Sequence, residues 1–177
     1  MIMQMRRRWT GLLAIMGAAA VLSGCANKGP QVACPTVDVV DALHQTTAFK
    51  AGAIGDLSAV LHRVEIADFA ATCRVSKDQI SLPIKVRLIA NRGPANVTDD
   101  AEVAYFVAIL DAAQNVVTKQ VYQARVPFDG GSQRVAIDEE FMPVLPYKSA
   151  DERAGYRVLI GLQVDRATLQ YQRSRRQ

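Results

Sequence analysis

The sequence predicts an all-β protein: an antiparallel β-sandwich of about seven strands, immunoglobulin-like or fibronectin-III-like. Three observations predict this fold class. Apolar and polar residues alternate along several stretches, which is the period of a strand with one face in a core. Turn signals separate these stretches at short intervals, and no long amphipathic helix pattern interrupts them. A small β-barrel is the alternative that the same pattern allows.

The N-terminal part of this pattern contains one ambiguous segment and one strand whose apolar residues change from even-numbered to odd-numbered positions (a change of parity). Residues 36–49, TVDVVDALHQTTAF, fit a strand or a helix, and we interpret them as the first strand. In residues 60–75 two apolar sets have opposite parity: Val60, His62, Val64 and Ile66, then Phe69, Ala71, Cys73 and Val75. A bulge near Ala67 and Asp68 would turn both sets inward.

The clearest alternation lies in residues 80–90, ISLPIKVRLIA. Its apolar face is made of Ile80, Leu82, Ile84, Val86, Leu88 and Ala90. Lys85 and Arg87 lie on the opposite face, so we expect a strand between core and water. Because Pro83 has no N–H to donate, this strand should lie at a sheet edge or carry a bulge there.

The C-terminal half repeats the pattern of strands and turns. Residues 103–110 are apolar on both parities, as expected of a central strand covered on two sides. The turn AAQN and residues 116–128 complete a hairpin. The turn DGGS precedes a strand at 133–141, and a loop marked by Pro143 and Pro146 follows. The last strand is 156–165, its inward residues being Tyr156, Val158, Ile160, Leu162 and Val164.

The N-terminus has the order of a signal segment. Three arginines at 6–8 precede an apolar run of about 14 residues, from Trp9 to Leu22, which is shorter than the roughly 20 residues of a bilayer span. The stretch that follows, Leu-Ser-Gly-Cys25, resembles the lipobox of bacterial lipoproteins. The resemblance implies that a diacylglyceryl group is added to the sulfur of Cys25 and that the signal peptide is removed before it. An ordinary secretory signal with a chance cysteine is the alternative.

This resemblance sets the expected domain organisation and location. Residues 1–24 are the signal peptide, 25–34 the lipidated N-terminus and short linker, 35–166 the sandwich, and 167–177 a short basic tail. Asp165 or Thr168 could cap a brief helix in that tail. The acyl chains on Cys25 would anchor the chain to a membrane. Ala26 in place of an aspartate implies the periplasmic face of the outer membrane, with that of the inner membrane as alternative.

The charge of the chain gives no reason to expect a nucleic-acid partner. Its net charge of +4 comes from 21 basic and 17 acidic side chains, and three of the basic ones lie in the signal segment. The mature chain therefore has 18 basic side chains against 17 acidic ones. Three arginines lie in the last five residues, RSRRQ, so the body itself is slightly acidic. Such a balance does not favour a phosphate-binding groove.

The remaining cysteines, Cys34 and Cys73, are an even pair in an oxidising compartment, so we expect a disulfide. Two free thiols are the alternative. A metal site is disfavoured because His44 and His62 are the only histidines and neither has a ligand spacing from a cysteine. If Cys34 is bonded, the linker 26–33 holds the body within about 30 Å of the lipid.

No motif of a known catalytic centre is present, so we expect neither enzymatic activity nor a cofactor. His62 has the inward parity of a strand, and His44 is most simply a surface residue. Asp138, Glu139 and Glu140 form the densest acidic run, in which Asp138 and Glu140 share a face and Glu139 points away. Paired carboxylates can act as acid and base or bind a hard cation, but a solvated strand end is the simpler interpretation.

Three stretches, ADFAATCR, YFVAILDAAQNVVTKQVY and YRVLIGLQVDRATLQY, resemble an uncharacterised group of small envelope lipoproteins of Gram-negative bacteria. The resemblance implies no catalytic residues. The leading hypothesis is therefore a non-enzymatic interaction or structural module beside the membrane, with an envelope protein as partner. The second is a carrier or sensor of a small apolar ligand, held between the sheets or beneath the loop 143–146. The third is an envelope hydrolase.

Overall fold

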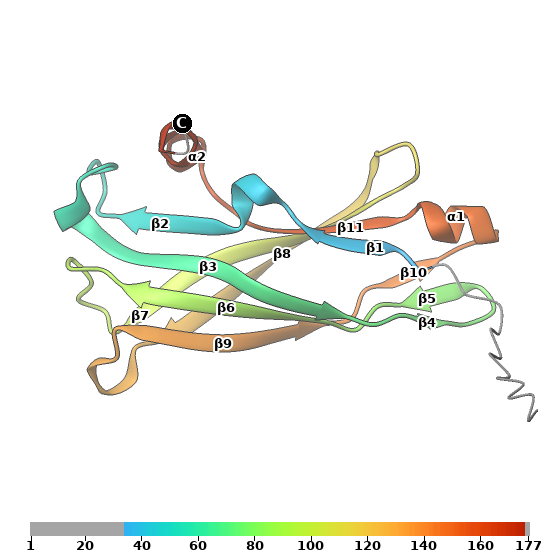
Figure 1. The fold of residues 1–177 in the computed structure, drawn as a ribbon, viewed down its shortest axis with the longest axis horizontal. Helices are drawn as coiled ribbons and strands as arrows, with labels where there is room; N and C mark the ends of the chain where they lie inside the picture. The colour runs from blue at the N-terminus through green and yellow to red at the C-terminus, as the bar shows by residue number, and fades with distance from the viewer. Residues whose placement is uncertain (1–33, 176–177) are drawn as a thin grey trace, which may run out of the picture. The chain divides into compact units, whose positions relative to one another are not determined.

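The computed structural model describes residues 34–175, which form eleven strands, three short 3-10 helices (η) and two α-helices (Figure 1). In chain order they are β1 (Thr36–Val39), η1 (Asp41–Leu43), β2 (Gln45–Phe49), η2 (Leu57–Ala59), β3 (Val60–Ala71), β4 (Arg74–Val75), β5 (Gln79–Ser81), β6 (Ile84–Arg92), β7 (Asp100–Leu110), β8 (Val116–Pro127), η3 (Asp129–Gly131), β9 (Arg134–Phe141), β10 (Val144–Pro146), α1 (Ala150–Gly155), β11 (Arg157–Leu162) and α2 (Arg166–Ser174).

The strands form two four-stranded sheets and one small three-stranded sheet. Sheet A has the order β1-β11-β7-β8, sheet B the order β2-β3-β6-β9, and sheet C the order β10-β5-β4. Every pair is antiparallel except β1 with β11. Sheets A and B pack on a common core, which confirms the predicted sandwich. Both sheets end in edge strands within residues 34–175, so the barrel alternative is wrong.

The core lies between sheets A and B and is built from the predicted inward faces. All six apolar residues predicted to share a face in residues 80–90 are at most 2 % exposed. The inward residues of β11, Val158, Ile160 and Leu162, are fully buried on the opposite sheet. Within residues 34–175 the two sheets therefore share one continuous core.

β7 lies in the middle of sheet A and is covered on both faces, as its sequence predicts. Tyr105, Val107 and Ile109 point into the main core. Phe106, Ala108 and Leu110 form a second small cluster on the outer face, packed against Val40, Leu43 and Leu159. The hairpin from β7 to β8 turns at Gln114, which has a φ of 65°.

Residues 36–49, predicted to be the first strand, are two strands in different sheets. β1 pairs with β11 in sheet A, and β2 pairs with β3 in sheet B. The short helix η1 carries the chain from sheet A to sheet B. Just before it, the Val40 N–H donates to the carbonyl of Ile160 in sheet A at 2.8 Å. No local pattern marks this crossing, because most residues in both halves are only partly buried.

The prediction that Pro83 marks a sheet edge is wrong, since β6 lies between β3 and β9. Pro83 instead separates β5 from β6: the N–H of Leu82 donates to Pro143, and the carbonyl of Pro83 accepts from Thr72. The chain therefore leaves sheet C for sheet B at the residue that cannot donate. The bulge predicted in β3 is confirmed by a register shift between Ile66 and Asp68.

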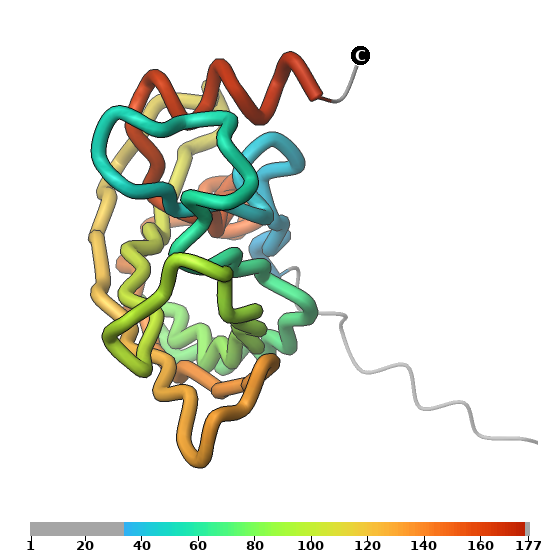
Figure 2. Tube along the Cα trace, turned by 90° about the vertical axis from the view of Figure 1, so that its left-hand side faces the viewer, coloured from blue at the N-terminus to red at the C-terminus, as the bar shows by residue number. Residues whose placement is uncertain are grey.

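The C-terminal elements complete the body. The loop expected after Phe141 contains the short strand β10 and the helix α1, whose N-cap is Ser149. The predicted C-terminal helix is α2, and its N-cap Asp165 accepts from the N–H of Thr168. α2 crosses over β2, seen end-on in Figure 1 and from the side in Figure 2, and its Tyr171 packs edge-on against Phe49 at 5.2 Å. Gln172 donates to the carbonyl of Gln45 at 2.8 Å.

Candidate functional site

The predicted disulfide between Cys34 and Cys73 is confirmed, with the two Cα atoms 6.1 Å apart. It joins the first described residue to the segment between β3 and β4, so the N-terminal end of the body is fixed beside the end of β3. Cys25, the predicted lipidation site, lies outside the described residues. Among the described helices none is long and apolar enough to cross a bilayer.

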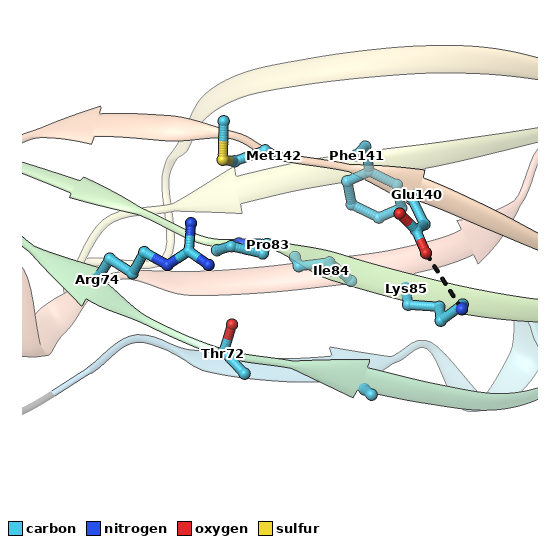
Figure 3. Close-up of a pocket in the computed structure, with 9 residues that line it drawn as sticks. Thr72, Arg74, Pro83, Ile84, Lys85, Glu140, Phe141 and Met142 are labelled. Atoms are coloured by element: carbon cyan, nitrogen blue, oxygen red, sulfur yellow. Dashed lines mark ion pairs between the residues drawn. The ribbon is translucent and has the colours of Figure 1, made fainter.

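A surface groove of about 510 Å³ lies next to this disulfide, on sheet B where it meets sheet C (Figure 3). The end of β3, the start of β6 and the end of β9 bring its residues together, since Ala71 pairs with Ile84 and Ile84 pairs with Phe141. Pro83 and Met142 supply an apolar lining, whereas the neighbouring Ile84 and Phe141 pack in or against the core. Met142 is 57 % exposed, which is unusual for a methionine.

Charged residues lie at the two ends of the groove. At one end Lys85 pairs with Glu140 at 3.1 Å and with Asp138 at 3.5 Å. At the other end lie Thr72 and Arg74, which flank Cys73. Arg74 has no ion partner among residues 34–175, and Figure 3 shows its guanidinium directed toward Pro83. The groove therefore has one neutralised end and one cationic end.

A second hollow, of about 270 Å³, lies under β8. It is bounded by inward residues of β7 and β8, including Thr118 and Gln120, and by residues 142–144. Tyr122 on β8 stacks on Phe141 on β9 at 5.6 Å beside it. This is the space beneath the segment 143–146 that the ligand-carrier hypothesis named, and hydroxyl and amide groups form much of its lining.

β8 itself is an exposed edge strand. It is twelve residues long, and in residues 34–175 it pairs only with β7. Its first six residues are exposed on both faces, including Val116, Val117 and Val121 at 61 %, 54 % and 51 %. Lys119 is turned onto the sheet: its ammonium lies 4.4 Å from the centre of the Phe106 ring and donates to Gln163 at 3.1 Å.

The acidic run 138–140 is an ion-pair network. Arg87 donates to both carboxylate oxygens of Asp138 at 2.8 and 3.0 Å, and Lys85 bridges Asp138 and Glu140. The pKa of Asp138 lies below its ordinary value of 3.8, chiefly because of the hydrogen bond from Arg87. Glu139 points to the other face and accepts from the Tyr105 hydroxyl at 3.2 Å, as its parity predicts. This arrangement holds Asp138 ionised, whereas a general acid needs a raised pKa.

The two histidines have different surroundings. His62 is buried on β3, and its Nε2 lies 3.2 Å from the carbonyl oxygen of Glu102 on β7. Burial lowers the pKa of its imidazole below the ordinary value of 6.5. His44 is half-buried beside η1, with Nδ1 2.6 Å from the carbonyl oxygen of Asp41. In the described part of the chain no group of three His, Cys, Asp or Glu side chains has the geometry to hold a metal ion.

A scan against protein-family models, a search of curated proteins and a search of solved structures each gave no match. The candidate sites therefore rest on geometry alone. The groove residues Arg74 and Met142 have no local motif in the sequence. The sequence could have indicated the exposed edge of β8. Residues 116–122 mix valines with polar residues at both even and odd positions, whereas the core strands keep their apolar residues on one face.

Proposed function

We propose that this chain is a bacterial envelope lipoprotein, anchored through acylated Cys25, that acts as a non-enzymatic interaction module beside the membrane. The observation that carries the proposal is the exposed edge of β8. The partner is an extended segment of an envelope protein, because an added strand forms its backbone hydrogen bonds with an unpaired sheet edge. Side chains of one parity on that segment would face the hollow beneath Thr118 and Gln120.

The other main-sheet edges have features that discourage pairing, and β8 lacks them. Edge strands are normally short, covered or charged. β1 has four residues, α2 packs against β2 through Tyr171 and Gln172, and β9 carries Arg134, Asp138 and Glu140. Lys119 is the only charged residue between Val116 and Tyr122 of β8, and its ammonium lies over Phe106 instead of projecting from the edge.

The anchor would place this edge beside the membrane. If Cys25 is acylated, the eight residues 26–33 and the bond from Cys34 to Cys73 keep the body within about 30 Å of the lipid. The lipobox predicts the periplasmic face of the outer membrane, with the inner membrane as alternative. Partners are then restricted to proteins in or near that membrane.

Site-specific photo-cross-linking in intact envelopes tests the proposal. A photo-reactive amino acid at Val117 or Val121 should give a discrete product that contains a peptide of one envelope protein, located by mass spectrometry. Val97, which is 84 % exposed in the turn between β6 and β7, is the matched control position and should give no such product.

Two results would contradict the proposal. Cross-links from β8 that are no more frequent than those from Val97 would remove the edge as the interaction surface. A mature protein with an unacylated first residue, or one beginning elsewhere than at Cys25, would remove the anchor.

A further inference from the structure

The groove beside the disulfide combines an apolar lining with a single unneutralised charge. Pro83 and Met142 form the accessible apolar part, and the pairing of Lys85 with Glu140 neutralises one end. Arg74, at the other end, has no acidic partner in the described body, and the Thr72 hydroxyl points into the same space (Figure 3). Its volume of about 510 Å³ is within the range of small-ligand sites.

This polarity selects the class of ligand. An anionic head is needed beside Arg74, because a guanidinium pairs well with carboxylate or phosphate oxygens. An unbranched apolar tail is needed along Pro83 and Met142, because only apolar contact is offered there. A compact polar anion would leave the apolar lining in water, and a neutral hydrocarbon would leave Arg74 without a counter-charge.

We infer that this groove is a binding site for a single-chain anionic amphiphile from the membrane, of which a fatty acid is the simplest case. The head lies at Arg74 and Thr72, and the acyl chain runs past Pro83 and Met142 toward the Lys85–Glu140 pair. The site lies on sheet B and shares Met142 with the hollow under β8. Its access to membrane lipid rests on the proposed anchor, because Cys73 lies between Thr72 and Arg74 and is bonded to the residue where the tether ends.

Calorimetric titration with dodecanoate, below its critical micelle concentration, tests the chemistry of the groove. The protein is the chain from residue 26 onward, exported behind an ordinary cleavable signal so that the disulfide forms and no acyl chain competes. This chain contains all the core residues of the described body. One dodecanoate should bind per chain, and dodecyltrimethylammonium, which has the same tail and a cationic head, should not bind.

Two variants and one control locate the site. Arg74→Gln should weaken dodecanoate binding by about tenfold, because one charge-assisted contact is lost. Met142→Glu should abolish it by placing a negative charge in the tail path, and at a position 57 % exposed the change leaves the core intact. Arg166→Gln, an exposed arginine on α2, should bind as the unmodified chain does.

The inference is overturned if dodecanoate does not bind, or if it binds equally well to the Arg74→Gln and Met142→Glu variants. Equal binding of the cationic amphiphile would also overturn it, since the head group would then make no contribution. Because this titration uses a chain without its anchor, its result is independent of the cross-linking from β8 that tests the proposed function.

Discussion

His62 on β3 and Glu102 on β7 join the two main sheets through a hydrogen bond of 3.2 Å from the imidazole Nε2 to the main-chain carbonyl oxygen. A carbonyl oxygen only accepts, so Nε2 carries the proton of a neutral imidazole. The ring is buried, and the carboxylate of Asp100 nearby is already engaged by Arg125. The contact therefore stabilises the packing of sheet A on sheet B while His62 is neutral.

The first prediction is that the protein loses stability as the pH falls below about 6.5. Burial lowers the pKa of His62 in the folded state, so the unfolded chain takes up the proton first. The contribution of His62 to the free energy of unfolding should be greatest above its unfolded-state pKa of 6.5. It should be lost as the pH falls through the lower pKa of the folded state. Urea unfolding at pH 7.5 and at pH 5.5 measures the difference. His62→Gln should flatten this dependence and His44→Gln should preserve it; equal dependence in both variants would exclude His62 as its cause.

The second prediction concerns the disulfide. Replacing Cys34 and Cys73 by serine should lower the free energy of unfolding by about 4 kcal/mol, because the bond closes a loop with a sequence separation of 39 and restricts the unfolded chain. Chemical reduction of the unmodified protein should give a similar loss, measured by urea unfolding. A loss well below 1 kcal/mol in both experiments would show that the loop is already constrained without the bond.

The faces of the strands could be predicted from the sequence because the signal is local. Six alternate apolar residues between Ile80 and Ala90 are enough to define an inward face, and the parity change in β3 is enough to place its bulge. The brief C-terminal helix was expected from a cap at Asp165 or Thr168, and Asp165 is the residue that caps α2. Each of these features depends on residues only a few positions apart, where backbone geometry decides which side chains share a surface.

The pairing of distant segments could not be predicted in the same way. The parallel pairing of β1 with β11 joins Val37 to Val158, and nothing in either segment specifies the other. The groove depends on the register that aligns Ala71, Ile84 and Phe141 across three strands. Arg74 could not be predicted as a binding residue, because its lack of an acidic neighbour depends on which distant residues the fold brings near it.

The third prediction tests the small outer cluster of sheet A. Gly161 pairs with Phe106 across β11 and β7, and a Cβ added at Gly161 would lie 2.8 Å from two atoms of the Phe106 ring. Gly161→Ala should therefore lower the free energy of unfolding by about 1–3 kcal/mol through overpacking. Thermal or urea unfolding measures this loss. In a Phe106→Leu background the same substitution should cost much less; an equal cost in both backgrounds would mean that the ring is not the obstacle.

The last prediction distinguishes binding at the β8 edge from stability of the fold. Val117 and Val121 lie on the outer face of β8 and are more than half exposed, so changing both to lysine should leave the urea midpoint unchanged. The same change places two extra charges on the edge, which should weaken the pairing of an apolar strand by about tenfold. Photo-cross-linking from Gln120 measures the amount of the partner product. The control pair Leu57→Lys and Val97→Lys alters two apolar residues away from β8 that are at least as exposed, and it should leave the product unchanged. Undiminished cross-linking in the Val117 and Val121 variant would show that the partner does not bind along this edge.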